Sequence, residues 1–348
     1  MDFGSTLINW YSIHKRDLPW RNTKSPYHIW LSEIILQQTQ IKQGQPYYEA
    51  FIKEYPTIFD LAKADEQDVL KLWQGLGYYS RARNLHAAAK TIVEEFDGEF
   101  PKSYHGLLKL KGVGDYTASA IASICFGEPT AVVDGNVYRV LSRYFGIETP
   151  INSTKGIKEF KALASQLLDK NNPADYNQAI MEFGARQCRP KNPDCAICSL
   201  NSGCVAFQNN SIDKLPIKLN KTKVKIKYFN FLVFLSSDKR TILKKRTKNG
   251  IWKNLYQFPL IETEIPLNSI DFVKHPKIKS LLNGSNFEYS LYNDKEIIHK
   301  LSHQHLYTKF WIVEVNDLPE KGISVSEVEK FPMPILISNF INEFSFPL

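Results

Sequence analysis

The sequence predicts an α+β protein of more than one domain, in which a long helical region precedes a smaller α/β domain. Residues 26–43 and 46–100 have the pattern of helices, and further helices are expected between residues 147 and 187. From residue 228 onward, short runs rich in aromatic and β-branched residues are typical of strands. A chain of 348 residues is long enough for two or three such domains.

Composition narrows the class of protein. The hydrophobic fraction of 43% is ordinary for a globular chain, and no apolar run approaches the roughly 18 residues of a membrane span. The first residues lack the basic and apolar regions of a signal peptide, so we expect a cytoplasmic protein without membrane contact. A net charge of +8 favours a polyanionic partner, although many basic proteins bind nothing of that kind.

The N-terminal segment combines cations with an aromatic residue. Arg16, Trp20 and Arg21 can form a basic, aromatic edge that faces DNA. A solvated loop with one packed tryptophan fits the same residues equally well.

Glu33 is an unusual residue in the predicted helix 26–43. Its neighbours at helical spacing include Ile29, Trp30 and Leu36, so its carboxylate lies on a mostly apolar side. Such a carboxylate is costly to ionise, and its pKa is expected to rise, as a general acid near neutral pH requires. The alternative is a buried glutamate held by a backbone or arginine partner.

Breaks are expected at Pro46, at Pro56 and at residues 75–77. Tyr78, directly after the last break, can stack on unpaired bases, or it can simply belong to the core.

Residues 105–146 contain a Gly-Val-Gly turn between two helical stretches. Glycine adopts backbone angles closed to other residues, so a tight hairpin is expected at Gly112 and Gly114. The helix after it starts near Asp115, and its free N–H groups suit a phosphate. An ordinary turn between packed helices is the alternative.

Four cysteines lie close together, at positions 188, 195, 198 and 204. Four thiolates at this spacing can share a metal centre, and both zinc and a [4Fe–4S] cluster accept four sulfurs. Lys191, in the loop between them, can meet a phosphate. The remaining Cys125 is expected to be a buried core residue, and residues 209–227 form a lysine-rich linker.

Several of these segments resemble one family. Leu-Lys-Gly-Val-Gly-Asp-Tyr-Thr-Ala followed by Val-Asp-Gly-Asn-Val resembles the helix-hairpin-helix superfamily of DNA glycosylases. Ser-Glu-Ile-Ile-Leu-Gln-Gln-Thr-Gln and Gly-Leu-Gly-Tyr-Tyr-Ser-Arg-Ala-Arg look like its adenine-specific branch, the MutY family, and the cysteine spacing is similar to that of the family's cluster. The resemblance spans roughly residues 5–345.

The resemblance implies a domain plan. A helix-hairpin-helix glycosylase region covers residues 1–208, with a six-helix barrel at about 24–130 and flanking helices and an iron–sulfur loop at 131–208. Residues 209–227 are the linker, and residues 228–348 form a Nudix-like α/β domain that recognises 8-oxoguanine. The glutamate-rich Nudix box is absent from the sequence, so magnesium-dependent pyrophosphate hydrolysis is not expected.

The implied activity is that of a monofunctional, monomeric adenine glycosylase of base excision repair. Its substrate would be double-stranded DNA with adenine opposite 8-oxoguanine or guanine, and its cofactor a structural [4Fe–4S] cluster held by Cys188, Cys195, Cys198 and Cys204. Glu33 would be the acid, Asp134 would stabilise or bond to the sugar cation, and Asn136 would orient both. Tyr116 stands where lyase relatives have the lysine that forms a Schiff base.

The family also implies a set of DNA contacts. These are Arg16, Trp20, Arg21, Gln37, Gln38, Thr39, Leu76, Gly77, Tyr78, Tyr79, Lys111, Gly112, Val113, Gly114, Gln178, Lys191, Ser302 and His303. The sequence departs from the family pattern at Lys111 (usually proline), Gln178 (often glutamate) and Leu301 (phenylalanine). Two other classes stay open, a bifunctional lyase for oxidised pyrimidines and a non-catalytic DNA-binding module.

Overall fold

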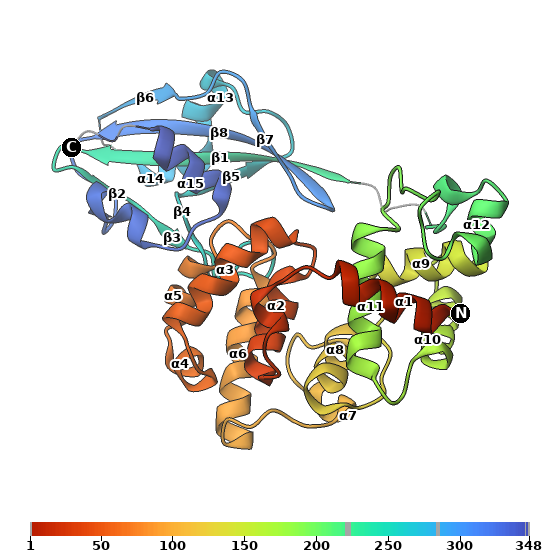
Figure 1. Cartoon of the computed structure of the whole chain (residues 1–348). Helices are drawn as coiled ribbons and strands as arrows, with labels where there is room; N and C mark the ends of the chain where they lie inside the picture. Colours follow the sequence, from red (N-terminus) through yellow and green to blue (C-terminus); the bar gives the residue numbers. More distant parts are fainter. Residues whose placement is uncertain (1, 220–223, 283–285, 345, 347–348) are drawn as a thin grey trace. The chain divides into compact units, whose positions relative to one another are not determined.

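The computed structural model describes residues 2–219, 224–282, 286–344 and 346. Contacts divide the chain into two compact units, the first formed by residues 2–63 and 84–219 and the second by residues 64–83 together with the chain from 224 onward (Figure 1). The boundaries expected from the sequence, at 208 and 228, stay a prediction. Two of the linker lysines, at positions 221 and 223, lie outside the described residues.

The first unit is helical. Its elements are α1 (Phe3–His14), α2 (Pro26–Leu36), α3 (Ile41–Glu54), α4 (Ile58–Lys63), most of α6 (Ser80–Phe96), α7 (Tyr104–Leu107), α8 (Asp115–Phe126), α9 (Gly135–Phe145), α10 (Thr154–Leu167), α11 (Pro173–Arg186) and α12 (Val205–Gln208). Helix α11 packs against α1, α8 and α9, while α2 packs against α3 and α8. None of the helices in the described ranges is long and apolar enough to cross a bilayer.

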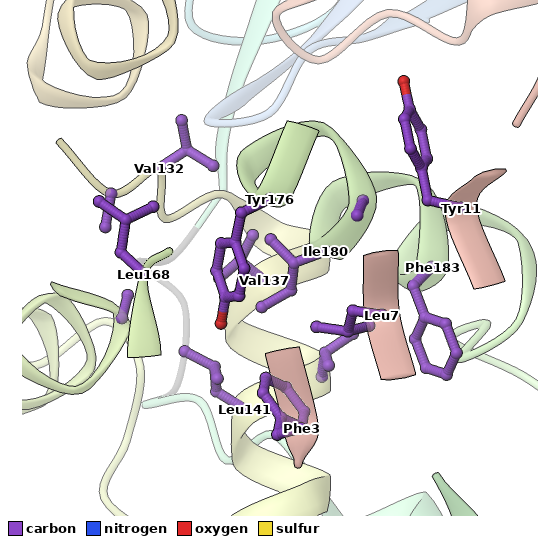
Figure 2. Packing of buried hydrophobic residues seen from close by; sticks show 14 of the residues in the cluster. Phe3, Leu7, Tyr11, Val132, Val137, Leu141, Leu168, Tyr176, Ile180 and Phe183 are labelled. Carbon is purple, nitrogen blue, oxygen red and sulfur yellow. The ribbon is translucent and has the colours of Figure 1, made fainter. Parts of the chain in front are cut away.

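One hydrophobic core fixes the position of α9. Figure 2 shows Phe3 and Leu7 of α1 close to Leu141 of α9, with Ile180 of α11 beside them. Burying each of these side chains contributes about 1.5–3 kcal/mol. The core therefore holds α9, whose N-cap is Asp134, in a fixed place relative to α11.

The helix expected over residues 26–43 is interrupted. Helix α2 ends at Leu36, and Gln38 has a positive φ of 54°, which breaks the helical path before α3 begins at Ile41. The break predicted at Pro46 is wrong, since α3 runs through it and buries Tyr48 and other residues of the same face. The breaks predicted at Pro56 and at residues 75–77 are confirmed.

The second unit is built on a mixed sheet. Its elements are α5 (Glu66–Leu72), β1 (Lys225–Ser236), β2 (Arg240–Thr241), β3 (Lys244–Lys245), β4 (Tyr256–Gln257), β5 (Leu260–Thr263), α13 (Ser269–Lys274), α14 (Pro276–Leu281), β6 (Phe287–Leu291), β7 (Ile297–Lys300), β8 (Gln304–Val315), β9 (Ile323–Ser324) and α15 (Ile335–Glu343). Strands β1 and β8 run parallel at its centre, with β5 antiparallel to β1, and β6 and β7 antiparallel to β8. The strands predicted after residue 228 are therefore confirmed.

Helices cover both faces of this sheet. On one face, Phe272 of α13 stacks on Trp311 of β8 at 4.1 Å between ring centroids. On the other face, Phe340 of α15 stacks on Phe310 at 4.1 Å, and Phe310 stacks on Phe231 of β1. Residues 310 and 311 point to opposite faces because side chains alternate along a strand.

Candidate active site

The Gly-Val-Gly turn joins α7 to α8 as a hairpin. Gly112 has a φ of +80°, and a Cβ built there would lie 2.7 Å from Cβ of Asn84, so this position requires glycine. Gly114 is extended (φ −96°, ψ −178°), so the unusual angles expected for it are wrong. Among the residues that the structure describes, no side chain caps α8. Lys111, Gly112 and Gly114 are exposed, and Val113 is buried. The exposed hairpin can present backbone N–H groups to an anion.

Glu33 lies on α2 with part of its side chain accessible to solvent. Burial raises its pKa from the usual 4.5 to about 7, helped by the negative charge of Asp134 and opposed by the Tyr116 hydroxyl and by Arg21. The rise expected from its apolar neighbours is confirmed. Such a group is protonated in a large fraction of molecules near neutral pH.

Asp134 is the N-cap of α9. Its Oδ1 accepts hydrogen bonds of 2.8 Å from the backbone N–H groups of Asn136 and Val137. A helix N-terminus by itself lowers the pKa of a carboxylate, so the motif predicts a lowered pKa for Asp134, and this prediction is wrong in net direction. Desolvation raises the pKa of Asp134 and outweighs these hydrogen bonds and the nearby Arg139.

Asn136 is held at both ends of its side-chain amide. Its Nδ2 donates to Asp134 Oδ2 at 2.8 Å, and its Oδ1 accepts from Arg139 at 2.8 Å. The same guanidinium donates to the carbonyl oxygen of Gly184 at 2.6 Å and to that of Cys188 at 2.7 Å. The carboxylate of Asp134 is thus connected through two side chains to the backbone of the first cysteine.

Tyr116 comes from the first turn of α8 and borders both carboxyl groups. Its hydroxyl contacts Met181 Sδ at 3.4 Å. Burial, with the charges of Glu33 and Asp134, raises its pKa well above the usual 10.0, so the hydroxyl stays protonated. At this position, a reacting sugar would therefore meet a neutral phenol and no amine.

The N-terminal cations have an internal partner that sequence reasoning missed. Glu182 of α11, of which 1% of the side chain is exposed, receives hydrogen bonds from Arg16 at 2.6 Å and Arg21 at 2.8 Å. These arginines hold the pKa of Glu182 at about 2 despite its burial. Trp20 is also buried and packs edge-on against Tyr48. These side chains therefore form packing contacts and ion pairs within the first unit, and their contact with DNA stays a prediction. No sequence signal links Glu182 to arginines more than 160 positions earlier.

The predicted DNA contacts that follow α2 and the one on α11 all lie in the first unit. Gln37 donates to the Thr117 hydroxyl at 3.2 Å, Gln38 is exposed, and Thr39 is half-buried. On α11, Gln178 accepts a hydrogen bond from the Tyr11 hydroxyl at 3.1 Å.

A second group of predicted residues lies in the second unit. Tyr78 has a φ of +46°, is 49% exposed, and its hydroxyl lies 2.6 Å from that of Ser302. Both line a hollow of about 450 Å³, together with Gly77 and His303. Leu76 and Tyr79 are buried, so they pack beneath the hollow and expose little surface to a ligand. Two segments that are distant in the sequence therefore meet at one hollow.

The four cysteines at 188, 195, 198 and 204 line a single hollow in the first unit, beside Arg143. Arg143 is buried, and its guanidinium donates to the backbone carbonyls of Arg189 and Pro190 and lies 3.5 Å from Cys188 Sγ. Among the described residues, no three His, Cys, Asp or Glu side chains are grouped to hold a single metal ion. Four thiols that line one hollow can serve together as the ligands of an iron–sulfur cluster.

Two other predicted residues complete this description. Lys191 is exposed in the loop between the first two cysteines. Cys125 is half-buried, where full burial was expected, and desolvation raises its pKa to about 12.

A hairpin suited to phosphate and two adjacent carboxyl groups in a helical unit are features of enzymes that excise bases from DNA. A family model described as the HhH-GPD superfamily of base excision DNA repair proteins matches residues 31–166, and a NUDIX domain model matches residues 230–343. The chain is 36% identical over 302 residues to the adenine DNA glycosylase of Buchnera aphidicola subsp. Schizaphis graminum, covering 86% of this chain and 84% of that one. The chain belongs to the adenine DNA glycosylase family, as its motifs predicted.

One further relative and two solved structures are also similar to this chain. The adenine DNA glycosylase of Homo sapiens is 45% identical over 222 residues, which cover 61% of this chain and 41% of the human protein. A solved thermostable thymine-DNA glycosylase is 31% identical, with a TM-score of 0.56 over 60% of this chain and 95% of that one. Endonuclease III in a covalent DNA complex, 20% identical with a TM-score of 0.53 over 60% of this chain and 94% of that one, is similar in fold.

Proposed function

We propose that this enzyme hydrolyses the N-glycosidic bond of adenine paired with 8-oxoguanine or guanine in double-stranded DNA, with Glu33 as the acid. The observation that carries the proposal is the pKa of about 7 at Glu33, beside Asp134, in a chain of this family. The target nucleoside would leave the duplex to reach these groups, as substrates of base-modifying enzymes do.

The first step is protonation of the base. Glu33 in its neutral form gives its proton to N7 of adenine. The C1′–N9 bond then breaks, its electron pair stays on N9, and neutral adenine leaves. The sugar acquires oxocarbenium character, and Glu33 becomes a carboxylate. General acid catalysis of this kind typically contributes 10²–10⁴-fold in rate.

Asp134 would act on the positive sugar. Its carboxylate can stabilise the cation electrostatically or bond to C1′ until water replaces it, with retention of configuration. The hydrogen bonds from Asn136 and from the first turn of α9 fix its direction. This fixed geometry lets Asp134 act without reorganisation at the moment of bond cleavage.

Tyr116 limits the reaction to hydrolysis. A Schiff base with the sugar requires a primary amine, which a phenol lacks. We therefore expect an abasic site as the product, with the DNA strand left intact.

The opposing base would be recognised by the hollow of the second unit. The Ser302 hydroxyl can donate to or accept from an altered base edge, and the exposed ring of Tyr78 offers a stacking surface. Leu301 supplies an apolar neighbour in the same hollow. The hairpin around Gly112 would contact backbone phosphates, and so would Lys191 in the loop between Cys188 and Cys195.

The four cysteines, Cys188, Cys195, Cys198 and Cys204, would hold a [4Fe–4S] cluster. A cluster bound there would link the two ends of the cysteine loop. Its role would be structural, because hydrolysis of the glycosidic bond requires no electron. Arg143 already binds the loop carbonyls on one side. Purified protein should contain about four irons per chain and absorb in the visible range.

The test of the function is product analysis. We expect free adenine, quantified by chromatography, from a duplex with adenine opposite 8-oxoguanine, and none from a duplex with adenine opposite thymine. Borohydride should trap no covalent protein–DNA adduct. Release of an oxidised pyrimidine with trapping would indicate the bifunctional lyase, and binding without base release would indicate a DNA-binding module.

A further inference from the structure

The second unit contains a basic pocket that the glycosylase reaction does not use. It is a hollow of about 400 Å³, within the size range of small-molecule sites. Its cationic side chains come from the β3 segment and from α14, and its walls come from β4 and β5. The lining cations are Lys244, Lys245, Arg246, Lys248 and Lys277.

Two acidic residues line the pocket, and each has a cationic partner. Lys244 forms an ion pair with Glu320, and Lys227, from outside the pocket, forms one with Glu262 at 3.2 Å. The pocket therefore carries an excess of positive charge beyond these pairs.

Two of these cations, Arg246 and Lys277, are also partly desolvated. Arg246 is half-buried and donates to Gln257 at 2.8 Å, and desolvation lowers its pKa. Desolvation likewise lowers the pKa of Lys277, with Lys244 and Lys248 lowering it further against the opposing effect of Glu262. Cations that repel one another across a concave site are stabilised when an anion neutralises them.

Backbone contacts orient one of these groups. The ammonium of Lys277 donates to the carbonyl oxygen of Leu260, which keeps the lysine over the pocket. Ammonium and guanidinium groups at close quarters suit the oxygens of phosphoryl groups, which accept several charge-assisted hydrogen bonds at once.

We propose that this pocket binds a compact phosphate-bearing anion, held by Arg246, Lys248 and Lys277. The same chemistry is offered by a small molecule with a pyrophosphate group and by consecutive phosphates of a DNA backbone. Hydrolysis is not part of the proposal, because both lining carboxylates are engaged in ion pairs.

The experiment is calorimetric titration of the full-length protein with inorganic pyrophosphate, in the absence of DNA and divalent metal. We expect one saturable site, with affinity about tenfold weaker in Lys277→Gln and in Lys248→Gln. Lys279→Gln is the matched control, because Lys279 is exposed on the same helix but does not line the pocket. Its affinity should equal that of the wild type.

A duplex added beforehand distinguishes the two sources of phosphate. If the duplex excludes pyrophosphate, the pocket takes the DNA backbone, and if both bind together, it takes a free small anion. Absence of saturable binding, or equal losses in Lys277→Gln and Lys279→Gln, would overturn the proposal. Thermal unfolding of each variant confirms that the lost affinity is not lost folding.

Discussion

Asn136 donates a hydrogen bond of 2.8 Å from Nδ2 to Oδ2 of Asp134, and Arg139 holds the other end of the same amide. The carboxylate also accepts two backbone hydrogen bonds at Oδ1, so both of its oxygens are fixed. The direction in which Asp134 points is therefore set before any substrate arrives.

Removal of this amide should slow the chemistry and spare binding. In Asn136→Ala, Asp134 loses the donor at Oδ2, so we expect single-turnover adenine release to slow by about 10–100-fold. The dissociation constant for a duplex with an uncleavable adenosine analogue should stay within about twofold. A loss confined to the dissociation constant would refute the role given to Asn136.

The raised pKa of Glu33 has a consequence for stability. The folded protein holds this proton more tightly than the unfolded chain does. Protonated Glu33 therefore contributes fully to the free energy of unfolding below pH 4.5, and this contribution is lost as pH rises through about 7. Glu33→Gln mimics the protonated form, and we expect it to stabilise the protein by about 2 kcal/mol at pH 8, and by less at pH 5. Urea unfolding at the two pH values measures the difference, and an equal effect at both would contradict the raised pKa.

The lowered pKa of Glu182 gives stability the opposite dependence on pH. Its pKa of about 2 means that its ion pairs stabilise the fold above pH 4.5 and are lost as pH falls through about 2. At pH 7, Glu182→Gln leaves Arg16 and Arg21 without their charged partner, and we expect a loss of about 3 kcal/mol in unfolding free energy.

An exposed ion pair serves as the control for Glu182. Glu99→Gln breaks only a surface pair with Lys102, so it should change stability by less than about 0.5 kcal/mol. Equal effects of the two substitutions on chemical unfolding would show that the buried pairs contribute no more than the surface pair.

The hairpin glycines should differ in their tolerance of alanine. Gly112→Ala meets both a positive φ and a Cβ contact of 2.7 Å with Asn84, so we expect a destabilisation of about 1–3 kcal/mol. Gly114 is extended and has open space around its Cβ position, so Gly114→Ala should leave the melting temperature nearly unchanged. The pair of melting curves checks this, and matched losses would be evidence against the hairpin geometry.

The sequence predicts what depends on local pattern. The raised pKa of Glu33 follows from apolar neighbours at helical spacing, and the start of α8 follows from the Gly-Val-Gly turn. The site residues come from the family resemblance, and their roles stay proposals.

What the sequence missed depends on distant contacts. The pKa of Asp134 rises because tertiary packing buries a helix cap, which its local motif does not show. Glu182 acquires its arginines only through the packing of the N-terminal segment on α11. The break at Gln38 was missed because its positive φ occurs in a run without glycine or proline.

The proton held by Glu33 is the central claim, and the pH dependence of single-turnover adenine release tests it most directly. For the wild type, we predict a rate that declines at acidic pH, where Asp134 gains a proton, and that falls about tenfold per pH unit above about pH 7, where Glu33 loses its proton. Glu33→Gln should be 10²–10⁴-fold slower and lack this fall. A variant that releases adenine at the wild-type rate, with the same pH profile, would contradict the account.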